Sequence, residues 1–320
     1  MFIYLLRRLL QAVPLILGAT IITFLLIHLA PGDPIVALAG EDGDPGYYEM
    51  MRKRFGLDKP LYEQLLIYLR GLATGDLGFS YRYNQPAIQV ILDRLPATLL
   101  LMLPALVIAI IIGLGLGIGS AVKPHGLRDL SLSSLSLLGH TVPVFWLAQI
   151  LLLVFAFQLD LFPVQGMTNA RYRYEGFRLI WDVAQHMVLP VTALAVQYMA
   201  PIARVSRASL IETLNLDFIR TAKAKGLPHR IIIFKHALRN AVLPVVTVIG
   251  GQLGFMVSGA VLTETVFAWP GLGRLLLSAM LNRDYAIITA MFLLLSIAIV
   301  VITLLVDLLY AVLDPRIRYA

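Results

Sequence analysis

Charge-free stretches are the feature of this sequence that most restricts its fold. Asp, Glu, Lys and Arg are absent from six runs of 21 to 30 residues, at 9–32, 95–122, 130–159, 183–203, 240–263 and 285–306. A helix of 21 residues is about 31 Å long, close to the thickness of the hydrocarbon core of a bilayer. The sequence therefore predicts an all-α, polytopic membrane protein with six transmembrane helices.

Composition agrees with a lipid environment. Charged residues make up 14% of the chain and hydrophobic residues 59%, whereas a soluble domain carries about 25% charged residues. Disordered chains are poor in apolar residues, so that class is excluded as well. The first run is longer than the apolar core of a secretion signal and continues to Pro31 without a small-residue cleavage site. We therefore expect it to be retained as a membrane span.

Basic residues are concentrated in alternate segments between the runs. One set of segments holds 14 Lys and Arg against 5 Asp and Glu, and consists of 1–8, 123–129, 204–239 and 307–320. The other set holds 12 against 14, and consists of 33–94, 160–182 and 264–284. Short loops rich in Lys and Arg lie on the cytoplasmic side of a membrane. The first set, with both termini, is predicted to be cytoplasmic, and this bias accounts for the net charge of +7 without nucleic-acid binding.

The external segment 33–94 contains turn signals and one helix signal. Gly and Pro cluster at 43–46 and 75–78, and apolar residues repeat at helical spacing between Pro60 and Leu72. This segment is too polar to span a membrane, and we expect an external cap or a docking surface.

A short helix is predicted within the basic loop 204–239. Asp217 is expected to cap a helix over 218–225, Gly226 to occupy the position after its end, and Pro228 to prevent continuation. A helix this short is marginal unless something packs on it, so we expect a partner protein to supply that packing. Contact of the basic residues with anionic lipid headgroups is the alternative.

Two blocks in and after this loop resemble the coupling loop of permease subunits in ATP-driven importers. They are residues 220–226 (Arg-Thr-Ala-Lys-Ala-Lys-Gly) and 236–247 (His-Ala-Leu-Arg-Asn-Ala-Val-Leu-Pro-Val-Val-Thr). The likeness is greatest to B-type permease subunits of the dipeptide/oligopeptide/nickel family of ABC importers. Further blocks in the same order are 31–34 (Pro-Gly-Asp-Pro), 75–78, 262–274, 283–285, 307–310 and 314–318. The general importer motif begins Glu-Ala-Ala, and this chain keeps its second Ala as Ala222 and its Gly as Gly226 but departs from it at Arg220 and Thr221.

The resemblance implies a type I importer permease of the bacterial inner membrane that forms half of the pathway for di-/oligopeptides or similar small polar solutes. Its partners would be a homologous permease subunit, two ATP-binding subunits and an external solute-binding protein. No cofactor is expected on this chain, and ATP and Mg²⁺ would be held by the ATPase subunits. The residues expected to couple to an ATPase are Asp217, Phe218, Arg220, Thr221, Ala222, Lys223, Lys225 and Gly226.

Several other polar or small residues have both a functional and a structural interpretation. Gln149, Gln197, Thr247 and Gln252 are candidates for the translocation pathway or for hydrogen bonds between helices. Glu264, Trp269 and Arg274 are candidates for external docking or an outer gate, or for a turn with Trp269 as an interfacial anchor. His28 and His140 are expected to be hydrogen-bonded structural residues. The pairs Gly113/Gly117 and Gly115/Gly119 have the G-x-x-x-G spacing of close helix contacts.

Two other classes of membrane protein are alternatives to an importer permease. A secondary transporter driven by an ion gradient is disfavoured because the six runs contain no carboxylate for a proton relay. An intramembrane enzyme is disfavoured because H-E-x-x-H is absent and no paired Asp or Ser/His constellation falls within the runs. The absence of a P-loop motif excludes a P-loop ATPase site on this chain. No metal site is predicted. The chain has no cysteine and therefore no disulfide bond.

Overall fold

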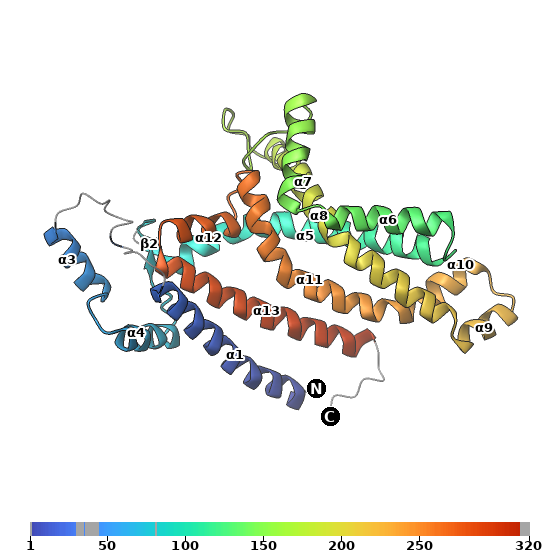
Figure 1. Ribbon diagram of the computed structural model, residues 1–320, viewed down its shortest axis with the longest axis horizontal. Helices are drawn as coiled ribbons and strands as arrows, with labels where there is room; N and C mark the ends of the chain where they lie inside the picture. The colour runs from blue at the N-terminus through green and yellow to red at the C-terminus, as the bar shows by residue number, and fades with distance from the viewer. Residues whose placement is uncertain (1, 30–34, 36–44, 81, 314–320) are drawn as a thin grey trace. The chain divides into compact units, whose positions relative to one another are not determined.

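A computed structural model of the chain describes residues 2–29, 35, 45–80 and 82–313 (Figure 1). The described chain divides into two compact units. The first unit takes in residues 1–96 and 271–301, and the second takes in 97–270 and 302–318. The motifs at 31–34 and 314–318 lie outside the described residues.

Helices account for most of the described chain, with one two-stranded hairpin. The elements that begin in the N-terminal part are α1 (Phe2–Leu29), α3 (Pro45–Phe55), α4 (Leu61–Ala73), β1 (Phe79–Ser80), β2 (Gln85–Pro86) and α5 (Ala87–Ala121). The middle of the chain contains α6 (Leu127–Thr141), α7 (Val144–Leu151), the π-helix η1 (Leu152–Gln158), α8 (Phe177–Leu214) and α9 (Asp217–Ala224). The last elements are α10 (His229–Ile231), the π-helix η2 (Ile232–Ala237), α11 (Leu238–Val266), α12 (Leu272–Leu281) and α13 (Tyr285–Leu313).

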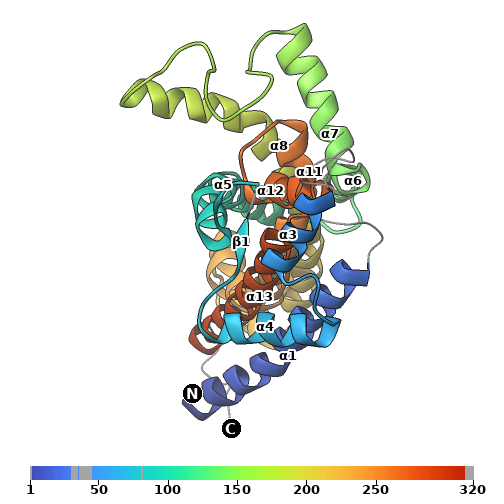
Figure 2. The same ribbon diagram turned by 90° about the vertical axis from the view of Figure 1, so that its left-hand side faces the viewer.

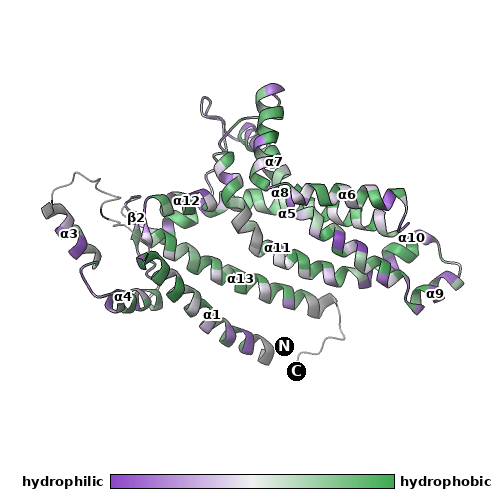
Figure 3. Ribbon diagram, viewed as in Figure 1, coloured by the Kyte–Doolittle hydropathy of each residue, from purple (hydrophilic) through white to green (hydrophobic). Residues whose placement is uncertain are grey.

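Among the described residues, five helices are long and apolar enough to cross a membrane, and each overlaps one of the charge-free runs. Their apolar portions are Leu6–Leu29, Ala87–Ala121, Phe177–Leu214, His229–Gly254 and Tyr285–Leu309. Hydrophobic residues extend along most of their length, as Figure 3 shows. The helices α5 and α8 are longer than the runs that predicted them, because a charge-free run marks the part of a helix in lipid and not where its hydrogen bonding stops.

The predicted span 130–159 differs from the other five, because it is not one continuous helix. α6 is followed by α7 and η1 at an angle of 96°, and the change of direction is visible in Figure 1. Pro143 has no N–H group to continue the helix, and Val142 before it has extended backbone angles (φ −77°, ψ 124°). The run is therefore a broken span or a re-entrant segment.

The core of the second unit is formed mainly by α5, α8 and α11. Leu101, Leu194 and Val245 are fully buried in it. Two glycines allow α5 to approach α8 closely: a Cβ atom at Gly113 would lie 2.7 Å from the carbonyl O of Met199, and one at Gly117 would lie 2.5 Å from the Cβ of Ser206. The helix-packing interpretation of this pair is confirmed. Gly115 has no atom within 4 Å of a Cβ position, so it does not contribute to this contact.

The first unit has a separate core and contains the segment that links α1 to α5. The helix predicted between Pro60 and Leu72 is confirmed as α4. The first half of the turn predicted at 43–46 lies outside the described residues, and its second half is wrong, because Pro45 and Gly46 begin α3. The helices α3 and α4 and the strand β1 of this unit are labelled in Figure 2. The hydroxyl of Ser80 donates a hydrogen bond to Asp284, and the Nδ1 atom of His28 lies 2.9 Å from the carbonyl O of Phe24. His28 is thus hydrogen-bonded, as predicted.

Candidate functional site: the short helix and the ion pair beside it

The short helix predicted in the basic loop is α9, and it begins one residue earlier than expected. Leu216 precedes it with extended backbone angles (φ −75°, ψ 154°), and no side chain caps its first turn. The prediction that Asp217 is the cap is wrong, because Asp217 already lies inside the helix. Its carboxylate instead lies 3.2 Å from the Nη1 atom of Arg220, in an ion pair that is almost entirely exposed to solvent.

The end of α9 agrees with the sequence prediction. Lys225 follows the last helical residue and Gly226 has a φ of +72°, the left-handed conformation that favours glycine at this position. A Cβ atom at Gly226 would have no neighbour within 4 Å. Within this chain, glycine is therefore required by the backbone angle and not by close packing.

One face of α9 is buried against its own chain. Ile219 is 0% exposed and Ala222 is 6% exposed, and these residues are three apart and share a helix face. They pack with Leu210 of α8 and Ile233 of η2 in a continuous apolar cluster. The expectation that a partner must supply this packing is wrong, because the neighbouring helices supply it. Ala222, one of the predicted coupling residues, is therefore buried and does not belong to the exposed surface of α9.

The opposite face of α9 is exposed, and most of the predicted coupling residues lie on it. Phe218 is 39% exposed. The other exposed members are Asp217, Arg220, Thr221, Lys223, Lys225 and Gly226. α9 thus presents one large apolar side chain among basic and polar ones, on a helix whose orientation is fixed by its buried face.

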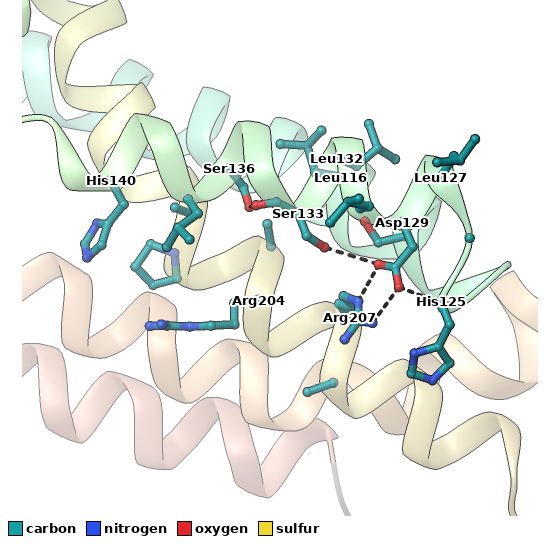
Figure 4. A pocket seen from close by; sticks show the side chains of 18 residues that line it. Leu116, His125, Leu127, Asp129, Leu132, Ser133, Ser136, His140, Arg204 and Arg207 are labelled. Atoms are coloured by element: carbon teal, nitrogen blue, oxygen red, sulfur yellow. Dashed lines mark hydrogen bonds and ion pairs between the residues drawn. The ribbon is translucent and has the colours of Figure 1, made fainter.

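An ion pair joins α8 to the beginning of α6, close to the α9 cluster. The Nε and Nη2 atoms of Arg207 each lie 2.6 Å from a different carboxylate oxygen of Asp129. Asp129 is 4% exposed, and it also accepts hydrogen bonds from the backbone N–H of His125 at 2.8 Å and from the hydroxyl of Ser133 at 3.2 Å. Figure 4 shows these four bonds. The buried carboxylate is therefore fully satisfied.

This ion pair lies at one end of a cavity of about 860 Å³, which is lined by α5, α6, α8 and the turn between α5 and α6. Arg204 and His140 also line it, as Figure 4 shows. The Nδ1 atom of His140 lies 3.3 Å from the carbonyl O of Gln197. Pro201 is four residues beyond Gln197 and has no N–H group for that carbonyl. His140 thus occupies the place of the missing helix donor, which agrees with its predicted structural role.

The four candidate pathway residues differ in exposure. Gln149 and Thr247 are exposed, whereas Gln252 is half-buried. The Oε1 atom of Gln197 is buried without a hydrogen-bond partner. None of the four lines the cavity of Figure 4. A pathway role for these residues stays a prediction.

Two of the three candidates for external docking are buried. Glu264 and Trp269 are each 0% exposed. The indole Nε1 of Trp269 donates a 2.8 Å hydrogen bond to the carbonyl O of Ala97. The prediction that these two side chains dock an external partner is therefore wrong, because docking requires exposure. The alternative prediction, that Trp269 is an interfacial anchor, is wrong for the same reason. Arg274 is exposed, and an outer gate in this region stays a prediction.

The Asp129–Arg207 pair was missed by the sequence reasoning. The two residues are 78 positions apart, and no local motif connects them. The only available signal was that Asp129 is the single acidic residue in the otherwise basic turn 123–129.

Comparison with known proteins gives matches over the whole chain. Residues 113–319 match the family model described as "Binding-protein-dependent transport system inner membrane component", and residues 1–102 match the model of the N-terminal part of such membrane components. The dipeptide transport system permease protein DppB of Alkalihalophilus pseudofirmus is 41% identical over 100% of both chains. DppB of Escherichia coli strain K12 is 40% identical over 99% of this chain and 98% of its own.

A third relative and a solved structure extend these matches. The oligopeptide transport system permease protein AppB of Bacillus subtilis is 38% identical over 99% of both chains. A chain in an inward-facing structure of the MetNI methionine ABC transporter is similar with a TM-score of 0.56 and 17% identity, covering 71% of this chain and 97% of that one. At this identity the structural likeness bears on the fold alone.

Proposed function

The chain belongs to the family of binding-protein-dependent transport system inner membrane components, and we propose that it forms half of the pathway for dipeptides and oligopeptides. It is a multi-pass permease subunit of an ATP-driven importer of the inner membrane, and the ATPase is a separate subunit. The substrate class rests on one observation: relatives named as dipeptide or oligopeptide permeases are 38 to 41% identical to almost the entire chain.

An importer of this family combines a permease pair with an ATPase and a binding protein. The arrangement we propose is a heterodimer of this chain with a homologous permease, bound to two ATP-binding subunits and served by an external solute-binding protein. ATP and Mg²⁺ would be bound by the ATPase subunits, and this chain would need no cofactor of its own.

The exposed face of α9 is the proposed contact with the ATPase. The buried Ile219 and Ala222 fix the helix on its own chain, so a force applied to the exposed face is carried into α8 and η2. Phe218 offers an apolar anchor for a groove, and Arg220 and Lys223 offer charge complementarity at its rim.

Both termini are proposed to be cytoplasmic because they belong to the basic set of segments, and contacts between loops support the grouping of segments on which this proposal rests. Asp129 and Arg207 come from two different segments of the basic set, and they form an ion pair. Gly166 and Phe267 come from two segments of the other set, and their backbones are joined by a 2.8 Å hydrogen bond. Segments with the same predicted side therefore lie together, as a single direction of insertion requires.

The coupling role is tested with a variant that leaves the buried face of α9 unchanged. Replacing residues 218–226 by a flexible Gly/Ser segment would remove the coupling surface, but also Ile219 and Ala222 from the core. We therefore favour Arg220→Ser with Lys223→Ser and Lys225→Ser, and expect the ATPase subunits to be lost on co-purification in detergent while membrane insertion is retained.

A matched control changes three exposed basic residues of the same loop outside α9: Arg230, Lys235 and Arg239, each to Ser. If the loop only binds anionic headgroups, the two triple variants will behave alike. Full ATPase recovery with the α9 variant would contradict the coupling role. Uptake in proteoliposomes without ATPase subunits, driven by an ion gradient, would contradict the importer and support the alternative of a secondary transporter.

A further inference from the structure

We propose that Asp129 and Arg207 position α6 as a bridge across a proline-weakened part of α8, so that displacement of α9 reaches the far half of α8. This inference rests on the proposed coupling role of α9. It assigns a function to an ion pair that lies outside α9 itself. The two residues are positioning residues, since neither is part of the exposed face of α9.

The near end of this path is a rigid connection between α9 and α8. Only Asn215 and Leu216 separate the two helices. Ile219 of α9 and Leu210 of α8 are both 0% exposed and belong to one apolar cluster, together with Ala121 at the end of α5. A displacement of α9 is therefore transmitted directly to the C-terminal end of α8.

The weak point of α8 lies between three and four turns before that end. Pro201 is inside the helix and leaves the carbonyl O of Gln197 without the N–H that normally bonds it. Helices bend most readily where a proline removes such a bond. Without support, a push on the C-terminal end of α8 would be absorbed by bending at Pro201.

α6 is bonded to α8 on both sides of that point. Beyond it, Arg207 holds Asp129 through two parallel bonds of 2.6 Å, a fork geometry that resists rotation. Before it, His140 lies 3.3 Å from the carbonyl O of Gln197. Asp129 and His140 are 11 positions apart in α6, and Gln197 and Arg207 are 10 positions apart in α8. At 1.5 Å per residue the two stretches have matching lengths of about 15 to 17 Å.

α6 and α8 are also in close contact at the His140 end of this stretch. A Cβ atom at Gly139 would lie 2.9 Å from the Cγ1 atom of Val196, so the end of α6 rests directly on α8. Figure 4 shows α6 lying along α8, with Asp129 and His140 at opposite ends of the shared stretch. α6 therefore stiffens the part of α8 that Pro201 weakens.

The test measures uptake per ATP hydrolysed by the intact importer in proteoliposomes, for wild type, Asp129→Asn and Arg207→Lys. Coupling between distant sites is worth 5-fold or more in well-coupled proteins, so we expect Asp129→Asn to lower peptide uptake per ATP by about 5-fold. Arg207→Lys keeps the positive charge but not the two parallel hydrogen bonds, so its uptake per ATP should lie between the values for wild type and Asp129→Asn. Asp93→Asn is the matched control, because it makes the same chemical change at an exposed residue of α5 that takes no part in the Asp129–Arg207 ion pair.

A second substitution separates stiffening from general stability. Pro201→Ala restores an N–H donor for the Gln197 carbonyl, so Pro201→Ala in the Asp129→Asn background should recover most of the lost coupling. The bend itself is measured between spin labels at Thr192→Cys and Glu212→Cys, two exposed positions of α8 about 30 Å apart. The chain has no other cysteine. Asp129→Asn should broaden the distance distribution, and the added Pro201→Ala should narrow it again.

Failure of this inference is distinguishable from failure of the proposed function. If ATPase subunits co-purify and hydrolysis is stimulated by the binding protein, but Asp129→Asn leaves uptake per ATP and the distance distribution unchanged, the bridge is overturned. A loss of coupling that Pro201→Ala does not reverse also overturns it. If the α9 variant loses the ATPase subunits while Asp129→Asn has normal uptake per ATP, the coupling role of α9 is supported and the bridge is overturned.

Discussion

The hydroxyl of Thr98 donates a 2.6 Å hydrogen bond to the Oε1 atom of Glu264, and both side chains are buried between α5 and α11. Removing the donor leaves the buried glutamate with one hydrogen bond fewer, so we expect Thr98→Val to lower the stability of the purified complex by about 1–3 kcal/mol. Thr265→Val is the control, since Thr265 is exposed on the same helix and should change stability by no more than about 0.5 kcal/mol. Equal thermal midpoints for both variants would show that this bond does not stabilise the fold.

The contact of α5 with α8 gives a prediction on two neighbouring glycines. Gly117→Ala places a methyl group 2.5 Å from the Cβ of Ser206 and 2.7 Å from the carbonyl O of Ala203, and such overpacking costs about 1–3 kcal/mol. Gly115→Ala has no neighbour within 4 Å and should be neutral or slightly stabilising. Thermal unfolding in detergent compares the two, and similar midpoints would contradict the close contact at Gly117.

Features that depend on local composition were predictable from the sequence. The absence of charge over 20 or more residues marks helices such as α5 and α13, because lipid imposes that composition on any spanning helix. Gly226 and Pro228 mark the end of α9, because glycine readily adopts the left-handed conformation that ends a helix and proline cannot continue one.

Features that depend on tertiary contact were not predictable in this way. Ile219 and Phe218 are adjacent apolar residues in a largely polar helix, and only the neighbouring helices show that Ile219 is the buried one. Glu is mostly exposed in proteins and Trp is enriched at membrane interfaces, yet Glu264 and Trp269 are buried through contacts with Thr98 and Ala97 on another helix. Asp129 and Arg207 are joined only because α6 lies along α8.

Substitutions of Gly226 at the end of α9 distinguish a requirement for its backbone conformation from a requirement for close packing. Gly226 has a φ of +72° but open space around its Cβ position. Gly226→Val should destabilise the end of the helix by more than about 1 kcal/mol and reduce recovery of the ATPase subunits, because β-branched residues strongly disfavour this conformation. Gly226→Asn should be close to wild type, since Asn tolerates it. If both variants lose the ATPase equally, the requirement lies in contact with the partner and not in the backbone angle.

Asp284 gives a prediction on pH. Its side chain accepts a hydrogen bond from the backbone N–H of Ile287 at 3.2 Å, which caps the start of α13, and another from the hydroxyl of Ser80. Burial raises the pKa of this carboxyl above its ordinary value of 3.8, against the opposing effects of these hydrogen bonds and of Arg82.

The folded state therefore holds the Asp284 proton to a higher pH than the unfolded state, and folding takes up a proton in that interval. This contribution to stability is fully present below pH 3.8 and is lost as the pH rises through the folded-state pKa. Asp284→Asn keeps an oxygen for the helix cap but cannot titrate. Relative to this variant, the thermal midpoint of the wild-type complex should fall as the pH is raised from 3.8, and parallel pH profiles would show that burial does not raise this pKa.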